Sequence, residues 1–210
     1  MKHFMPNVIK QIFALVVLCF TVVPSAHAQE EPRVPWDIFV TPKTGVMFSN
    51  LTELDGKTKA GLTLGVNAEI FLLPNFSFCT ELSYAHHGEN NYTNPKTEQK
   101  NSFSADYLYT DYTVRWYPIK QLNRLSVFGG VSMGTLFAAS VNGEKVKHEL
   151  NSGNVSIPLG IGFEKGKIAV DARIQYGLTK LADSSIARKN IGNAHLLTFG
   201  FTIGYRIHAF

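Results

Sequence analysis

The stretch LTFGFTIGYRIH, residues 197–208, decides the fold. Its large apolar side chains recur at every second position, and Thr, Gly, Arg and His fill the positions between them. A period of two places consecutive side chains on opposite faces of a β-strand. Residues 167–179 repeat the pattern, with Ile168 and Val170 on one face and Asp171 on the other. Both segments therefore predict strands that have one apolar and one polar face.

Eight segments of this kind follow residue 29, and no stretch there keeps a helical period. The expected strands cover residues 38–50, 59–72, 76–87, 103–117, 124–138, 154–164, 167–179 and 194–209. Short connections at 73–75, 118–123 and 165–166 alternate with long polar ones at 88–102, 139–153 and 180–193 and with a shorter one at 51–58. Outer-membrane barrels have short periplasmic turns and longer external loops. The sequence therefore predicts an all-β fold, an eight-stranded antiparallel up-and-down transmembrane β-barrel.

The two faces distinguish a membrane barrel from a soluble one. A soluble barrel turns its apolar face inward and shows water a charged surface. Here the polar face carries mostly small residues, which suit a crowded interior: Gly61, Thr63, Gly65, Ser77, Ser83, Ser126, Gly130, Ser132, Gly134, Ser156, Gly160, Gly162, Gly177, Gly200 and Gly204. The other face is large and uncharged, as expected where a charge facing lipid costs about 2–4 kcal/mol.

Aromatic residues gather near the ends of the apolar face. Such girdles mark the two membrane interfaces of a barrel. We expect the periplasmic girdle to contain Phe76, Trp116, Phe163 and Tyr205, and the outer girdle to contain Phe48, Tyr84 and Phe137.

The first residues predict export. A basic start, an apolar run at 12–23 and the sequence AHA at 26–28 are typical of a cleaved signal peptide. The run is too short to span a membrane as a helix, which needs roughly 20 residues. We therefore expect a signal peptide at 1–28 and a single outer-membrane barrel domain at 29–210. The expected location is the outer membrane of a Gram-negative bacterium.

Charge and cysteine content exclude other classes. The chain has 20 basic and 16 acidic residues, too close a balance to indicate nucleic-acid binding. Cys79 is the only cysteine after the leader, so no intramolecular disulfide is expected in the mature chain. Stability must therefore come from the barrel itself.

Ionisable residues interrupt the polar face on several strands: Lys43, Glu69, Glu81, Asp111, Arg115, Asp171, Arg173 and Arg206. Eight strands enclose an interior just wide enough for side chains to fill it. Buried charges persist only when they are paired and hydrogen-bonded. The sequence therefore predicts a lumen charge network and a plugged barrel. The alternative interpretation is a narrow channel that conducts ions or protons along these residues.

Histidines near the outer strand ends raise two further hypotheses. His86, His87, His148 and His195 lack the regular spacing of a metal site, so we expect solvated loop histidines and no metal. His86 has the phase and height of a catalytic residue in an outer-rim lipid A-modifying enzyme, an acyltransferase or deacylase. No Ser and acid stand convincingly beside it in the sequence, so we predict no catalytic residues and no cofactor.

Two residues disturb the pattern. Pro158 lies inside an expected strand, which predicts a bulge or one broken ladder bond. Phe210 resembles the terminal aromatic that the barrel-assembly machinery recognises, yet the phase of Tyr205 and Ile207 turns it inward. A late kink in the last strand would resolve this conflict.

Several of these strands resemble the PorT-like outer-membrane β-barrel family. The resemblance rests on residues 76–84, 106–112, 116–117, 128–130, 157–164 and 171–178, with the sequences FSFCTELSY, DYLYTDY, WY, FGG, IPLGIGFE and DARIQYGL. It implies a barrel in contact with outer-membrane lipid. The family's namesake belongs to a secretion apparatus, so the resemblance also suggests secretion-system or surface proteins as partners, by fold-level analogy. A structural or surface-interaction role remains the other interpretation.

Overall fold

The computed structural model describes residues 33–52, 57–93, 99–118, 124–181 and 194–209. The chain divides into two units after Glu31, and the description below concerns the second unit. The predicted signal peptide and Phe210 lie outside the described residues.

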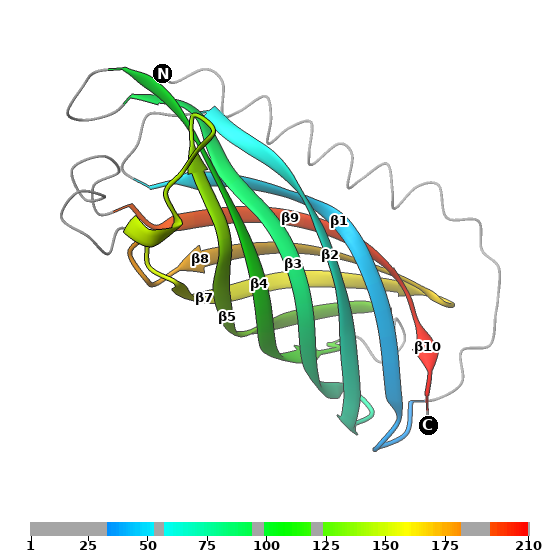
Figure 1. Ribbon diagram of the computed structural model, residues 1–210. Coiled ribbons are helices and arrows are strands. Elements are labelled where there is room, and N and C mark those ends of the chain that lie inside the picture. The colour runs from blue at the N-terminus through cyan, green and yellow to red at the C-terminus, as the bar shows by residue number, and fades with distance from the viewer. Residues whose placement is uncertain (1–32, 53–56, 94–98, 119–123, 182–193, 210) are drawn as a thin grey trace. The chain divides into compact units, whose positions relative to one another are not determined.

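Long antiparallel strands make up nearly all of this unit (Figure 1). Eight of them form the wall: β1 (Ile38–Leu51), β2 (Lys57–Leu73), β3 (Phe76–Thr93), β4 (Lys100–Trp116), β5 (Leu125–Val141), β7 (Gly153–Lys165), β8 (Ile168–Gly177) and β9 (Leu196–Tyr205). Each pairs with its neighbour in sequence, and β1 also pairs with β9 from Lys43↔Gly204 to Leu51↔Leu196. The sheet therefore closes, which confirms the predicted eight-stranded antiparallel barrel.

Three short elements supplement the wall. They are β6 (Glu144–Lys145), β10 (Ile207–His208) and the 3₁₀ turn η1 (Lys147–Glu149). Asn142 and Gly143 join β5 to β6, and both have positive φ, as the tight turn of a two-residue hairpin requires. None of the described helical segments has the length and apolar character needed to cross a membrane.

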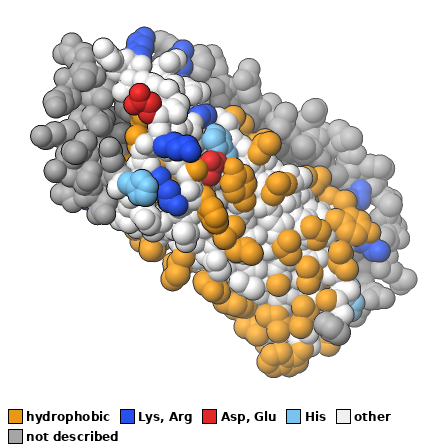
Figure 2. All heavy atoms as spheres, in the orientation of Figure 1, with side chains coloured by type: hydrophobic (Ala, Val, Ile, Leu, Met, Phe, Trp, Pro, Cys, Tyr) orange, Lys and Arg blue, Asp and Glu red, His pale blue; other side chains and the backbone are white. Residues whose placement is uncertain are grey.

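The strands turn their apolar side chains outward and their polar side chains inward. The burial of β8 alternates strictly, with Val170, Ile174 and Tyr176 exposed and with Asp171 and Arg173 buried. In Figure 2 hydrophobic side chains gather over the lower and right-hand part of the visible face, and most of the charged and histidine side chains in view lie toward the upper left. This inside-out arrangement suits a barrel surrounded by lipid.

Strands β3 and β4 continue farther than the sequence pattern predicts. Their ladder extends through Gly88↔Ser104 and Glu89↔Phe103 to Thr93↔Lys100, across residues expected to be loop. A register shift follows Glu89, and Asn91 has a positive φ of 55°. Because of the bulge and the polar composition, residues 88–93 lack the apolar–polar alternation that predicts a strand. A tall hairpin therefore rises from the end of the barrel that carries the long connections, the end expected to face outward (Figure 1).

Pro158 interrupts one ladder. Pairing between β5 and β7 stops at Gly129↔Leu159 and resumes in the same register at Ser132↔Ser156. On its other side Pro158 still pairs with Gln175 of β8. Since proline has no N–H to donate, the ladder breaks locally while the register is kept.

The last strand is interrupted at one residue, Arg206. Arg206 separates β9 from β10, and its side chain is buried whereas Ile207 and His208 are both exposed. β10 pairs with β1 in the register of β9, since Val40↔Ile207 continues from Lys43↔Gly204, and the alternation ends only at His208. Phe210 lies outside the described residues, so the late kink stays a prediction.

Candidate functional site: the barrel lumen

The eight charged residues predicted for the lumen all project into it. Each is at most 9% exposed. Two further charged side chains join them, Arg33 from the segment before β1 and Glu164 from β7. Among the described residues the ion pairs connect five acids with five bases: Glu69, Glu81, Asp111, Glu164 and Asp171 with Arg33, Lys43, Arg115, Arg173 and Arg206.

Arg173 holds the mid-height part of this network together. Its guanidinium lies 2.8 Å from Asp111 and also binds Glu81 on the opposite wall. Lys43 continues the chain, with its ammonium 3.1 Å from Glu81 and 2.6 Å from Asp171. Four strands are thereby connected across the interior.

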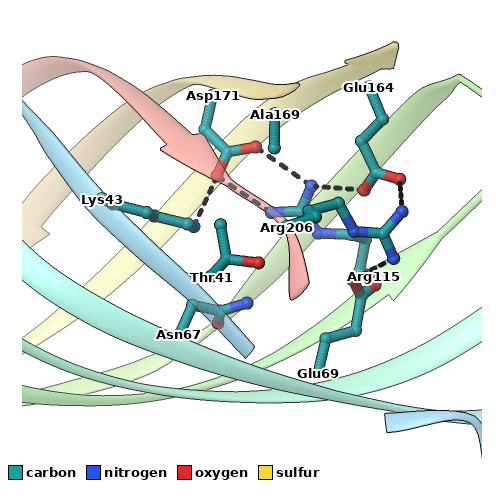
Figure 3. A pocket seen from close by; sticks show the side chains of 9 residues that line it. All are labelled: Thr41, Lys43, Asn67, Glu69, Arg115, Glu164, Ala169, Asp171 and Arg206. Atoms are coloured by element: carbon teal, nitrogen blue, oxygen red, sulfur yellow. Dashed lines mark hydrogen bonds and ion pairs between the residues drawn. The ribbon is translucent and has the colours of Figure 1, made fainter. Parts of the chain in front are cut away.

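The periplasmic part of the network is centred on Arg115 (Figure 3). Its two terminal nitrogens bind the two oxygens of Asp171 at 3.0 and 3.1 Å, the bidentate geometry that makes such pairs strong. Arg115 also lies 3.8 Å from Glu164, which binds Arg206 in turn. Arg206 closes the chain on Glu69 at 3.1 Å.

Neutral polar groups satisfy further carboxylate oxygens. Ser77 donates to Glu69 at 2.6 Å, and the Tyr117 hydroxyl lies 2.7 Å from oxygens of both Glu69 and Glu164. Ser132 donates to Asp111. Such additional hydrogen bonds are what a buried ion pair needs to offset the cost of losing water.

Cations stacked on aromatic rings close the periplasmic base. The Arg33 guanidinium lies 3.8 Å from the centre of the Tyr117 ring, and that of Arg206 lies 3.9 Å from the centre of the Phe39 ring. Phe71 packs against both Phe39 and Tyr117. These stacked contacts fill the interior below the ion pairs.

Little empty space remains among the charged groups. A cavity of about 10 Å³ lies between Lys43, Glu69, Arg115, Asp171 and Arg206, with Thr41, Asn67, Glu164 and Ala169 completing its lining (Figure 3). A cavity of this size holds at most about one water molecule.

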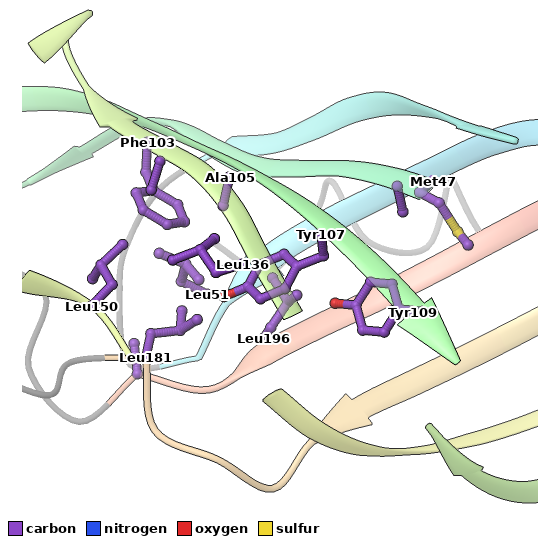
Figure 4. Close-up of a cluster of buried hydrophobic side chains, with 13 residues drawn as sticks. Met47, Leu51, Phe103, Ala105, Tyr107, Tyr109, Leu136, Leu150, Leu181 and Leu196 are labelled. Atoms are coloured by element: carbon purple, nitrogen blue, oxygen red, sulfur yellow. The ribbon is translucent and has the colours of Figure 1, made fainter. Parts of the chain in front are cut away.

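Mostly apolar side chains fill the outer half of the lumen (Figure 4), where Glu89 is also buried and accepts a hydrogen bond from the Leu51 N–H at 3.0 Å. Tyr107 and Tyr109 of β4 stack at 5.5 Å and pack with His87. The rest of this apolar cluster comprises Met47, Leu51, Ala85, Phe103, Ala105, Leu136, Ala139, Leu150, Leu181, Ala194 and Leu196. The interior therefore has two parts, called here the lower lumen (the ten charged residues) and the upper lumen (the apolar cluster).

The predicted girdle aromatics occupy the outer face. All seven occupy the strand positions that lie between the buried ones, as do the neighbouring exposed Leu, Val and Ile side chains.

The histidines fall in different surroundings. His87 is only 1% exposed and lies inside the upper lumen, so its expected place among solvated loop histidines was wrong. β3 continues past His87 in its pairing with β4, and His87 lies two residues after Ala85, so its side chain points inward as that of Ala85 does. Among the described residues, no three His, Cys, Asp or Glu side chains come together as a set of metal ligands.

His86 faces outward and has an acid beside it, which the sequence did not reveal. Asp106 lies directly opposite His86 in the ladder and binds its Nδ1 at 2.6 Å, while Tyr84 donates to the same carboxylate at 2.7 Å. Ser104, two residues before Asp106 on β4, accepts a hydrogen bond from Lys59. A polar cluster therefore stands just above the outer girdle.

Several solved structures are similar in fold to this chain. Neisserial surface protein A aligns with 12% identity over 81% of this chain and 97% of its own, with a TM-score of 0.50. The attachment invasion locus protein Ail of Yersinia pestis aligns with 13% identity over 83% and 100%, with a TM-score of 0.49. OprG from Pseudomonas aeruginosa aligns with 11% identity over 86% and 100%, with a TM-score of 0.47.

The sequence itself identifies the family. No curated protein matches the chain. A family model described as the outer membrane protein beta-barrel domain, however, matches residues 27–183, which is most of the sequence. The closed barrel and its apolar outer face agree with that match. The chain therefore belongs to the outer membrane protein beta-barrel domain family.

Proposed function

We propose that this outer membrane barrel has a plugged lumen and acts as a structural or surface-interaction protein. The observation that carries the proposal is the continuous pairing of five acids with five bases inside the wall. Ions cannot pass unless these pairs separate, and separation exposes unpaired charges at a cost of several kcal/mol. The tall β3–β4 hairpin supplies the surface that faces outward.

Planar-bilayer recording tests the closed lumen. The unmodified protein should show no steady conductance, because the ion pairs leave room for about one water molecule. Arg173→Ala serves as the comparison, since it removes the side chain that bridges Glu81 and Asp111. A steady, ion-selective current that Arg173→Ala abolishes would replace this proposal with the channel hypothesis.

The proposed mature protein begins after residue 28, with residues 1–28 removed as a signal peptide. Mass measurement of protein purified from outer membranes should find Gln29 at its N-terminus. Recovery of the uncleaved chain would contradict the proposed export route.

A role as an accessory of a secretion apparatus is supported by the PorT-like resemblance alone. Chemical crosslinking in native membranes followed by co-purification tests it. Deletion of the tip of the β3–β4 hairpin is the matched control, because a surface partner should be lost while the barrel remains. Recovery of the same proteins with an unrelated barrel would contradict a specific role.

A lipid-modifying activity is the second candidate, and the His86–Asp106 contact favours it. A carboxylate on Nδ1 orients a histidine so that Nε2 can act as a general base. Ser104 is the nearby hydroxyl on the same outer face. The test compares the lipid A of cells that carry the unmodified protein, His86→Gln or Ser104→Ala. Identical lipid A in all three would exclude the activity.

A further inference from the structure

The segment before β1 crosses the rim of the barrel, with residues on both sides of the wall. Arg33 points into the lumen, where it binds Glu164 at 2.7 Å and stacks on Tyr117. Three residues later Trp36 is 71% exposed. Backbone hydrogen bonds fix the segment to the end of β2, from Trp36 N–H to the Phe71 carbonyl at 2.7 Å and from Phe71 N–H to the Asp37 carbonyl at 3.0 Å.

A tight turn presents the Trp36 side chain. The Asp37 N–H donates to the Val34 carbonyl at 3.2 Å, Pro35 occupies the second position, and Trp36 has a φ of 76° at the third. Proline followed by a residue with positive φ is the signature of a type II turn, which strongly favours glycine at the third position. Trp36 therefore adopts a backbone conformation that is unfavourable for any residue other than glycine.

The surroundings of Trp36 belong to the lipid-facing surface. Leu72 and Leu73 at the end of β2 are exposed, and so is Ile207 of β10, which pairs with β1. The periplasmic girdle has aromatics on β3, β4, β7 and β9, whereas β1 and β2 present Ile38, Val40, Ile70 and Leu72 outward at this end. The Trp36 backbone is hydrogen-bonded to β2 at this gap.

We propose that Trp36 is an interfacial anchor that binds the headgroup and glycerol layer of periplasmic-leaflet phospholipids and completes the girdle at β1 and β2. Tryptophan is enriched at that depth because its ring is apolar and its N–H still finds polar partners. Contact with lipid offsets the unfavourable φ. The same segment carries Arg33, so the anchor also holds the lowest cation of the lumen in place.

Fluorescence quenching tests the anchor directly. The chain has two tryptophans, so Trp116→Phe leaves Trp36 as the only indole. In nanodiscs, phospholipids brominated near the carbonyl end of the acyl chain should quench Trp36 more than phospholipids brominated near the chain terminus. Acrylamide in the aqueous phase should quench it much less than it quenches the urea-unfolded chain. Trp36→Phe, which leaves Trp116, is the reference for an established girdle position.

Three results would overturn the proposal. Acrylamide quenching equal to that of the unfolded chain would place Trp36 in water. Insensitivity to both brominated lipids would mean that protein, such as a second copy of the chain, covers the ring. Stronger quenching from the terminal bromines would place the ring in the hydrocarbon core and not at the interface.

Proteolysis gives a second readout that separates anchoring from backbone strain. Trypsin cleaves after Arg33 only when this segment leaves the rim, so Trp36→Ser should accelerate that cleavage in nanodiscs several-fold while Trp36→Phe should not. Trp36→Gly removes the strain as well as the ring. If anchoring outweighs the strain, cleavage of Trp36→Gly also accelerates. Cleavage slower than in the unmodified protein would show that the strain exceeds the anchoring, and would overturn the proposal that lipid contact offsets the unfavourable φ.

Discussion

The lower and upper lumen fill the same barrel in two different ways. In the lower lumen, ten charged side chains form ion pairs across the interior. In the upper lumen, aromatic and aliphatic side chains pack with residues from the connections, such as Leu150 and Leu181. Apolar packing weakens in proportion to the atoms removed, whereas an ion-pair network fails when one partner leaves. The two halves should therefore respond differently to substitution.

Arg173→Ala should have the largest effect. It leaves Asp111 without its cation, while Glu81 keeps Lys43, and breaking a buried pair in this way costs about 3–5 kcal/mol of unfolding free energy. Urea titration in lipid vesicles measures the loss. The double variant Arg173→Ala/Asp111→Ala should recover part of it, because the stranded charge is gone. A double variant less stable than the single one would contradict the network.

Leu136→Ala tests the upper lumen in the same assay. Truncation of this buried leucine should cost about 2–5 kcal/mol through lost transfer energy and the cavity left behind. A second truncation in the cluster, Leu196→Ala, should lower stability further. Recovery on the second substitution would show that the two halves do not differ in the way proposed.

Leu159→Arg introduces a charge on the outer face of the wall, whereas the ion-paired charges of the lower lumen lie inside it. Leu159 faces lipid, and an arginine near the bilayer midplane should cost about 2–4 kcal/mol and impair assembly. Thr93→Arg, at the tip of the β3–β4 hairpin, is the matched control and should be tolerated. The yield of folded protein on unboiled gels, where closed barrels migrate faster, reports both. Equal tolerance would mean that the two faces are reversed.

Two buried tyrosines provide the finest comparison. Tyr117→Phe in the lower lumen removes a hydroxyl bound to carboxylates and should cost about 1.5–3 kcal/mol. Tyr107→Phe in the upper lumen should change stability by less than about 1 kcal/mol, because its hydroxyl meets no hydrogen-bonding partner among the described residues. Equal costs in urea titrations would remove the distinction between the halves.

The sequence pattern predicted the wall and most of the lower lumen because both depend on phase. Alternation of period two assigns each side chain to a face without knowledge of the register. Glu164 shares the phase of Gly160 and Gly162, so the same signal places it inside, although only the structure drew attention to it. Arg33 precedes the first strand, where alternation assigns no side chain to a face, so the pattern could not predict its place in the lumen.

The remaining features depend on register and on the loops. Asp106 stands beside His86 only because β3 and β4 pair as they do, and register is set by turns and bulges that alternation does not encode. In the upper lumen the inward face is largely apolar, whereas the sequence pattern predicted a polar inward face. Tyr107 and Tyr109 point inward in phase with Asp111, because apolar residues from the connections cover them at the outer end.

The ion pairs that cross the seam between β1 and β9 favour one register of closure. Lys43 of β1 reaches Asp171 of β8, and Arg206 beyond β9 reaches Glu69 of β2, so ion pairs cross the seam where the first and last strands meet. A slip of two residues would separate these partners by about 6.6–6.8 Å, and a slip of one would turn the charges toward lipid. Either error leaves unpaired charges, so the ion pairs make both slipped closures less stable than the one observed.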